Sequence, residues 1–199
     1  MDSPSSKFEY PDNLDMSGQL AYGVGVLVMQ WGICESVFYG ILDALAGQSN
    51  TGIGVVVWFS SRNNRDRIDL IVHLSKARAL STKTEREVAA ACKRMRSVTK
   101  VRNFFCHAYY EADALGDGAI KTVRGYSLTD AYEPLAVDAR PLTKGLLNEI
   151  ASAIRETARL NYDAWKLLLQ IQKELKVQHP ELPPGLHEYL SKADRPSDP

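Results

Sequence analysis

The sequence has few of the features that reveal a function at once. Its 199 residues include only three cysteines, Cys34, Cys92 and Cys106, which lie far apart and form no CxxC pair. This argues against a disulfide framework and a thiolate metal cage, so we expect no metal, no cofactor and a reducing, cytoplasmic location. Net charge is also absent, because 24 Lys and Arg residues balance 24 Asp and Glu residues. Nucleic-acid binding would therefore require a local basic patch.

Long apolar runs are missing as well. The most apolar segment, residues 20–29, is shorter than the about 20 residues that span a bilayer, so we expect no membrane partner. Residues 1–16 contain no basic stretch followed by an apolar one and predict a flexible lead rather than a signal peptide. With 45% hydrophobic residues, the chain is expected to form one domain over residues 17–178, followed by a C-terminal tail over residues 179–199.

Two long helices are predicted from apolar periodicity. Over residues 17–46, apolar side chains recur at alternating spacings of four and three, with Ser17 as the expected N-cap and Gly47 as the stop. A second apolar set on another face of this helix comprises Tyr22, Val26, Met29, Ile33 and Val37. The same spacing predicts a helix over residues 141–178. Because both helices carry more apolar surface than one bundle buries, one of them is expected to form a homodimer interface.

Two shorter helices are expected between the long ones. The first would begin at Ser60 or Ser61 and end near residue 80, after an extended connector over residues 55–59. The second would begin near Thr84, which forms a capping-box pattern with the glutamate three residues later, and would end near residue 107.

The pattern changes to β between the third and fourth predicted helices. Tyr109, Tyr110 and the run over residues 120–126 flank an Asp-Gly turn, which predicts a small β-hairpin at about residues 109–138. The predicted fold class is therefore all-α: a four-helix bundle with a small β-hairpin inserted between helices three and four.

The C-terminal half of the third predicted helix is the richest in chemistry. Five basic residues lie within ten positions: Lys93, Arg94, Arg96, Lys100 and Arg102. A solvated basic face balanced by Glu85 and Glu87 would account for the first three. Arg102, in contrast, follows Met95 by seven residues and lies within about 40° of the apolar stripe. An inward guanidinium must either form a buried salt bridge or face a cleft.

Arg102, Asn103 and His107 fit the R-N-x-x-x-H form of an Arg-x4–6-His motif, and the chain resembles HEPN (higher eukaryotes and prokaryotes nucleotide-binding) domains. The position of the motif near the end of the third helix, and Trp31 and Glu35 in a long first helix, extend the resemblance over most of the chain. It implies a metal-independent endoribonuclease of a toxin or abortive-infection type, whose dimer unites two motifs in one composite cleft. The alternative is a non-catalytic HEPN-like module that binds a nucleotide or a partner protein.

Two departures accompany the resemblance. Ala108 replaces the glycine that follows the motif histidine in many relatives. Arg67 and His73 form a second Arg–His match without the asparagine, which we assign to structure, with Asp66 or Asp69 as the salt-bridge partner.

Metal-free RNA cleavage needs a base for the 2′-hydroxyl proton and positive charge at the phosphate. His107 is the expected base, Arg102 the expected phosphate ligand, Asn103 an orienting group and Glu35 the acidic partner of Arg102 or of the site. Because five helical residues place Arg102 and His107 about 140° apart, their convergence requires a loosened helix or a second subunit. The other expected RNA contacts are Lys93, Arg96, Lys100, Tyr109 and Tyr110. The expected partners are RNA, a second copy of the chain, and an antitoxin or the product of a neighbouring gene.

Overall fold

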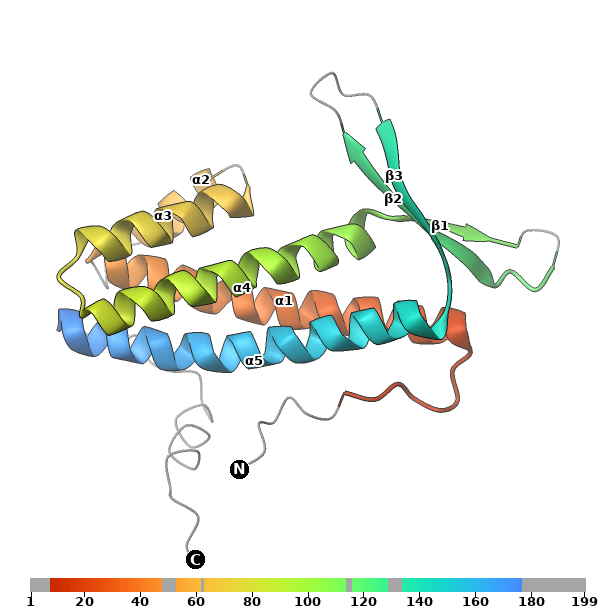
Figure 1. Ribbon diagram of the computed structural model, residues 1–199, viewed down its shortest axis with the longest axis horizontal. Helices are drawn as coiled ribbons and strands as arrows, with labels where there is room; N and C mark the ends of the chain where they lie inside the picture. Colours follow the sequence, from red (N-terminus) through yellow and green to blue (C-terminus); the bar gives the residue numbers. More distant parts are fainter. Residues whose placement is uncertain (1–7, 48–52, 62, 114–115, 129–133, 177–199) are drawn as a thin grey trace, which may run out of the picture.

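The computed structural model describes residues 8–47, 53–61, 63–113, 116–128 and 134–176. Within these ranges the chain forms five helices and three strands (Figure 1). In chain order they are α1 (Met16–Ala46), α2 (Ile53–Ser60), α3 (Asn64–Ala77), α4 (Thr82–His107), β1 (Tyr109–Ala112), β2 (Ile120–Leu128), β3 (Pro134–Pro141) and α5 (Lys144–Leu175). The protein is therefore mainly helical, with a small antiparallel sheet between the fourth and fifth helices.

Three long helices form the body of the molecule. α1 and α5 start at the end that carries the sheet and run side by side, while α4 returns in the opposite direction and packs on both (Figure 1). Two clusters of buried side chains fill the space between them, one around Trp31 and Phe38 towards α2 and α3, and one around Phe105 and Ile150 beneath the sheet. The buried residues of α1 include Leu20, Leu27, Trp31, Cys34 and Phe38, which confirms the first predicted apolar face.

The ends of α1 are set by local backbone chemistry. The Asp15 carboxylate accepts a hydrogen bond from the Gly18 N–H at 2.8 Å, so Asp15 is the N-cap and the prediction of Ser17 was wrong. Gly47 ends the helix with φ of 83°, as predicted, because glycine adopts the left-handed region without a Cβ clash. By length and composition α1 would suffice to cross a membrane, although a third of its most apolar window is buried inside the protein.

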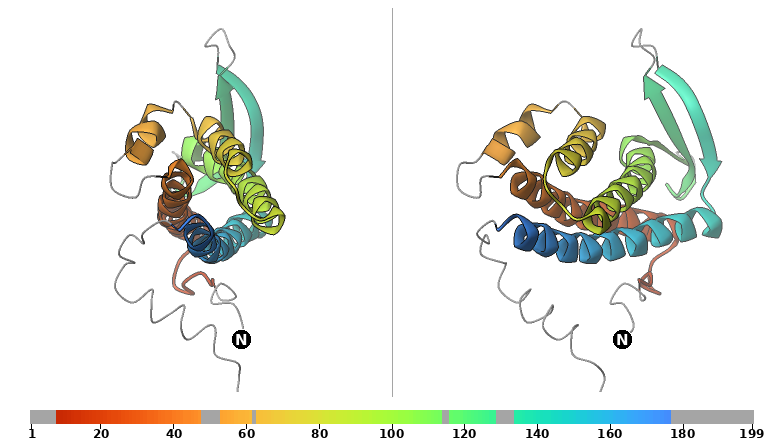
Figure 2. Two further views of the ribbon diagram at one scale, coloured as in Figure 1. Left: turned by 90° about the vertical axis from the view of Figure 1, so that its left-hand side faces the viewer. Right: turned by 60° about the vertical axis from the view of Figure 1, so that its left-hand side comes forward.

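The segment predicted as an extended connector is helical. Residues 55–59 belong to α2, which lies against α1 outside the three long helices (Figure 2). The β-branched run Val55–Val57 favours a strand locally, but burial of Trp58 against Tyr39, with ring centroids 6.2 Å apart, outweighs that preference. Hence the bundle has five described helices where four were predicted.

The starts of the two middle helices also differ from the prediction by a few residues. α3 begins at Asn64 rather than after Ser60 or Ser61, because the Asn63 side chain accepts from the Asp66 N–H. α4 begins at Thr82, with Ser81 rather than Thr84 as its N-cap. In both cases a different polar side chain close in the sequence caps the first turn.

The predicted hairpin is a three-stranded antiparallel sheet in the order β1-β2-β3. The Asp-Gly turn is present, with Gly118 at φ of 73°, but the third strand was not predicted. β2 crosses close over α4 at Gly125, where an added Cβ would lie 2.6 Å from the Phe104 ring. The sheet is thereby docked against the last two turns of α4.

The chain ends differ in part from the expectation. Residues 8–15, expected to belong to a flexible lead, pack on the core: Phe8 and Tyr10 contact it, and the Tyr10 hydroxyl donates to the Leu147 carbonyl at 2.7 Å. α5 ends at Leu175, where Lys176 takes a left-handed conformation. The predicted end at residue 178 and the tail over residues 179–199 lie outside the described residues.

Candidate active site at the end of α4

The motif occupies the last turn and a half of α4. The helix remains regular through His107, and Ala108 then takes an extended conformation (φ −71°, ψ 150°) that leads directly into β1. A glycine at position 108 would permit a left-handed helix end, whereas alanine favours this straight exit. Because the helix does not loosen, Arg102 and His107 leave it in directions about 140° apart.

Arg102 lies half-buried between α4 and α1. Its Nη1 donates to the Asn103 Oδ1 at 3.0 Å, and its guanidinium carbon lies 5.9 Å from the centroid of the Trp31 ring, which is 5% exposed. The Arg102 Nε is buried without a hydrogen-bond partner in the described part of the chain. No ion pair joins Arg102 to a described carboxylate, so the buried salt bridge considered above is not formed there.

Two other arginines of α4 are neutralised. The Arg94 guanidinium binds Glu156 at 2.7 Å and Asp163 at 2.5 Å, both on α5, and these hydrogen bonds raise the pKa of Arg94 against the effect of burial. Arg96 binds Asp69 on α3. The sequence predicted balancing by Glu85 and Glu87 on the same helix, which was wrong, since the partners come from neighbouring helices.

Glu35 does not bind Arg102. Its carboxylate accepts a hydrogen bond from the Arg67 Nη1 at 2.8 Å, and Arg67 also donates to the Trp58 carbonyl and lies over the Trp58 ring. Glu35 is one helical turn beyond Trp31, the residue that Arg102 contacts, yet its charge is used to fasten α3 and α2 to α1. The expectation that Asp66 or Asp69 would pair with Arg67 was also wrong.

The remaining predicted residues separate into exposed and structural ones. His107 is exposed at the end of α4, and Tyr109 is 60% exposed on β1. Tyr110 is partly buried and its hydroxyl donates to the Phe105 carbonyl at the end of α4; burial raises its pKa to about 12. We therefore assign Tyr110 to the attachment of β1 and retain Tyr109 as the aromatic side chain available for stacking.

The predicted RNA contacts on α4 share one exposed row. Lys93, Arg96, Lys100, Asn103 and His107 are all exposed, and their spacing of three or four residues places them on the same side of the helix. At 1.5 Å per residue this row is roughly 21 Å long. Arg102 lies on the opposite, inward side and reaches the end of the row only through Asn103.

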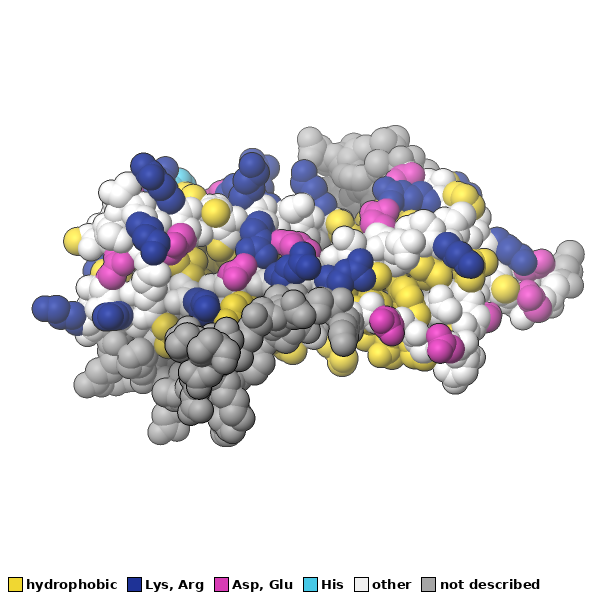
Figure 3. All heavy atoms as spheres, turned by 60° about the horizontal axis from the view of Figure 1, so that its bottom comes forward, with side chains coloured by type: hydrophobic (Ala, Val, Ile, Leu, Met, Phe, Trp, Pro, Cys, Tyr) yellow, Lys and Arg dark blue, Asp and Glu magenta, His cyan; other side chains and the backbone are white. Residues whose placement is uncertain are grey.

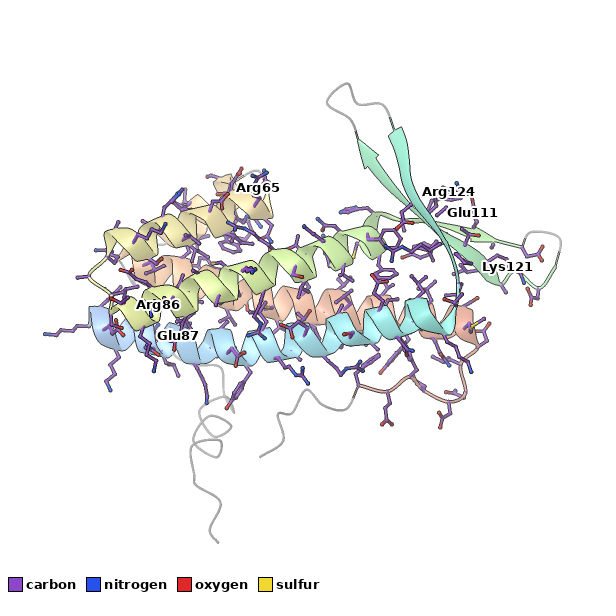
Figure 4. All side chains as sticks on the ribbon, viewed as in Figure 1. Arg65, Arg86, Glu87, Glu111, Lys121 and Arg124 are labelled. Atoms are coloured by element: carbon purple, nitrogen blue, oxygen red, sulfur yellow. The ribbon has the colours of Figure 1, made fainter. Side chains whose placement is uncertain are left out.

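The sheet beyond His107 carries paired charges. Arg124 on β2 binds Glu111 on β1 at 2.8 Å, and Figure 4 shows the two side chains together. Arg140 binds both Asp138 and Glu149. Of the described arginines in this region, Arg94, Arg96, Arg124 and Arg140 bind carboxylates, whereas Arg102 has no carboxylate partner among the described residues.

A groove that sequence analysis did not predict runs between α3 and α4. It has a volume of about 460 Å³ and is lined by Asn64, Arg65, Ile68, Asp69, Arg96, Thr99 and Lys100. No sequence signal relates the four α3 residues to the three α4 residues, because the two sets line one groove only when α3 packs on α4. In the part of the chain that the structure describes, no group of three or more His, Cys, Asp or Glu side chains could hold a metal ion.

Comparisons with protein families, with curated proteins and with solved structures found no significant match.

Proposed function

We propose that the protein is a metal-independent endoribonuclease of a toxin or abortive-infection type, which acts in the cytoplasm as a homodimer. The observation that carries the proposal is the state of Arg102. Arg94 and Arg96 on the same helix are bound to carboxylates, whereas Arg102 is held by Asn103 and Trp31 and keeps its charge unpaired among the described residues. A positioned, uncompensated guanidinium is suited to bind the two oxygens of a phosphate.

The reaction follows from the residue types at the end of α4. The His107 imidazole takes the proton of the 2′-hydroxyl, and the 2′-oxygen attacks the adjacent phosphorus. The bond between phosphorus and the 5′-oxygen breaks, leaving a 2′,3′-cyclic phosphate and a 5′-hydroxyl. Arg102 stabilises the charge of the crowded phosphate. The leaving 5′-oxygen takes its proton from the protonated imidazole of the second motif in the composite cleft.

The dimer is proposed to form through α1, because α5 turns a polar surface outward. On the side where α5 lies, basic and acidic side chains are interspersed (Figure 3). α1 in contrast has no charged residue between Met16 and Cys34, and Met29 is 64% exposed on its outer face, with Tyr22 and Ile33 beside it. Because this part of α1 carries no charge, the faces of two copies of the chain can pack together without like-charge repulsion.

The outer face of α1 is already used for helix packing within one chain. α2 covers it at Tyr39 and Asp43, where Trp58 contacts Tyr39 and Gly54 contacts Asp43. The same face continues uncovered past Gly32 and Gly25, at which an added Cβ would meet nothing within 4 Å. This open surface supports α1 of a second copy as its occupant, since two helices can approach closely there.

The test uses single-stranded RNA in excess chelator, with wild-type protein, Arg102→Ala, His107→Ala and the control Arg86→Ala. Arg86 is an exposed cation on the first half of α4, far from the motif (Figure 4). We expect the wild type and the control to cut RNA to a cyclic phosphate, and each motif variant to be slower by about 100-fold or more. An RNA with a 2′-deoxy sugar at the cut site should remain intact.

Two results would overturn the proposal. Cleavage that stops in chelator, or that persists in His107→Ala, would assign the chemistry to other groups. RNA binding without any cleavage by the folded wild type would favour the non-catalytic module.

A further inference from the structure

We infer that the groove between α3 and α4 is a second phosphate site, which holds the backbone of the RNA some distance from the bond that is cut. The inference rests on the proposed function, because it concerns how the substrate of the motif at 102–107 lies along α4. It adds Arg65 on α3 to Lys100 on α4, which the sequence already predicted as an RNA contact.

The groove contains more positive than negative charge. Arg65, Arg96 and Lys100 line it, against the single carboxylate of Asp69. Asp69 binds Arg96 and lies 3.9 Å from the Arg65 Nε, so one carboxylate is shared by two guanidinium groups. Lys100 forms no ion pair with any of the described carboxylates. The surplus of about two positive charges is sufficient for one phosphodiester, which carries a single negative charge.

A second groove shows that this surplus is not general. Between α4 and α5 lies a groove of about 360 Å³, whose charged residues are Glu87, Arg94, Asp163 and Lys166. There two cations face two carboxylates, and Arg94 is bound to Asp163. An anion is therefore favoured in the α3–α4 groove and not in the α4–α5 groove.

The walls of the α3–α4 groove are firm enough to form a site. The Asn64 Nδ2 donates to the Thr99 Oγ1 at 3.0 Å, and the Thr99 hydroxyl donates to the Met95 carbonyl at 2.7 Å. Ile68, which also lines the groove, is buried. The charged ends, in contrast, are accessible, with the Arg65 side chain 85% exposed (Figure 4). Because the backbone positions of these cations are already fixed by the packing of α3 on α4, binding a phosphate requires no rearrangement of the helices.

The groove is in line with the motif. Arg96 and Lys100 belong to the same exposed row of α4 as Asn103 and His107. Along the helix, Lys100 precedes His107 by roughly 10 Å and Arg96 precedes it by roughly 16 Å. A single strand whose cleaved phosphate is at His107 can therefore place another backbone phosphate between α3 and α4, and single-strand binding proteins follow the backbone with a basic groove in this way.

The experiment measures binding of a fluorescent single-stranded RNA that carries a 2′-deoxy sugar at the cut site, in chelator, over a range of KCl concentrations. The groove variant is Arg65→Gln with Lys100→Gln, and the matched control is Lys83→Gln with Arg86→Gln. All four side chains are exposed and the two variants lose equal charge. Circular dichroism melting checks that both remain folded.

We expect the groove variant to bind about tenfold more weakly. The slope of log affinity against log salt should decrease in magnitude by about 0.7, the value for one phosphate of a single strand. The control should bind like the wild type. Arg65→Lys with Lys100→Arg keeps the charge and should restore most of the affinity. In cleavage assays the groove variant should raise KM with little change in kcat, since the groove contacts substrate and transition state alike.

The failure of this inference differs from the failure of the proposed function. If the groove variant and the control lose equal affinity, or if neither loses any, the groove is not a phosphate site, even when Arg102→Ala abolishes cleavage. If the groove variant loses affinity while neither the wild type nor any variant cuts RNA, the phosphate site in the groove is supported and the proposed nuclease activity is refuted.

Discussion

The N-terminal end of α4 provides a test of how the motif helix is held in place. Glu174, on the last turn of α5, accepts hydrogen bonds from the Ser81 N–H at 2.8 Å, from the Ser81 hydroxyl at 3.1 Å and from the Thr84 hydroxyl at 2.5 Å. A carboxylate from another helix thus completes the cap of α4. The hydrogen bond from Thr84, and next that from the Ser81 N–H, lower the pKa of Glu174 from its ordinary value.

We predict that Glu174→Ala destabilises the protein by about 2 kcal/mol. Its removal leaves the fully buried Thr84 hydroxyl without its carboxylate acceptor and frees one helix N–H, and each such loss costs about 1 kcal/mol. Only these hydrogen bonds are counted, because Glu174 is partly exposed and solvent screens its charge. Glu174→Gln keeps one acceptor oxygen and should lose about half as much.

The effect depends on pH with a definite sign. Because the pKa of Glu174 is lowered by folding, its contribution is complete above the ordinary carboxyl pKa of about 4.3 and is lost as the pH falls through the lower, folded-state value. Urea unfolding followed by circular dichroism at neutral pH and at about pH 3 should therefore give a difference between wild type and Glu174→Gln that shrinks in acid. Glu87→Gln, which removes a partly exposed carboxylate 3.9 Å from Lys83, is the control and should change stability little. Equal stability of Glu174→Ala and wild type at neutral pH would refute the interhelical cap, and a difference that persists unchanged in acid would refute the role of the charge.

Two further predictions concern the dimer and the sheet. Met29→Glu places a charge on the open face of α1 and should convert the proposed dimer to a monomer in sedimentation at micromolar concentration, with loss of RNA cleavage. The control Lys93→Glu on α4 should leave the dimer intact. A wild type that sediments as a monomer would refute the composite cleft. Gly125→Ala should cost about 1–3 kcal/mol in unfolding measurements because its Cβ would lie 2.6 Å from the Phe104 ring. Phe104→Ala in the same chain should relieve part of that cost, and simple additivity of the two changes would argue against the contact.

Local sequence determined the helices that carry the motif. The three-and-four spacing of apolar residues located α1, α4 and α5, because this spacing is a property of each helix alone. Gly47 and the Asp-Gly turn at 117–118 were predictable for the same reason, since a positive φ has a local cost. The inward position of Arg102 also followed from its register with Met95.

Short or ambiguous segments were harder to predict. Residues 55–59 have β-branched side chains and look like a strand, and only the packing of Trp58 on α1 makes them helical. The strand over residues 134–141 has no hairpin signal of its own and depends on pairing with β2. Phe8 and Tyr10 precede any periodic pattern, and their docking on the core depends on α5.

The partners of the charges were decided by the tertiary structure alone. Glu35 and Arg67 are 32 residues apart, and Arg94 is 62 residues from Glu156, so no spacing rule connects them. Which arginine of the second half of α4 is left without a described carboxylate, and which groove has surplus positive charge, depends on how α3 and α5 pack against α4. The sequence determined that Arg102 turns inward. The packing of helices distant in the chain determined that it contacts Trp31 and Asn103 there and no described carboxylate. The physical reason is that ion pairs form between surfaces that only the folded chain brings together.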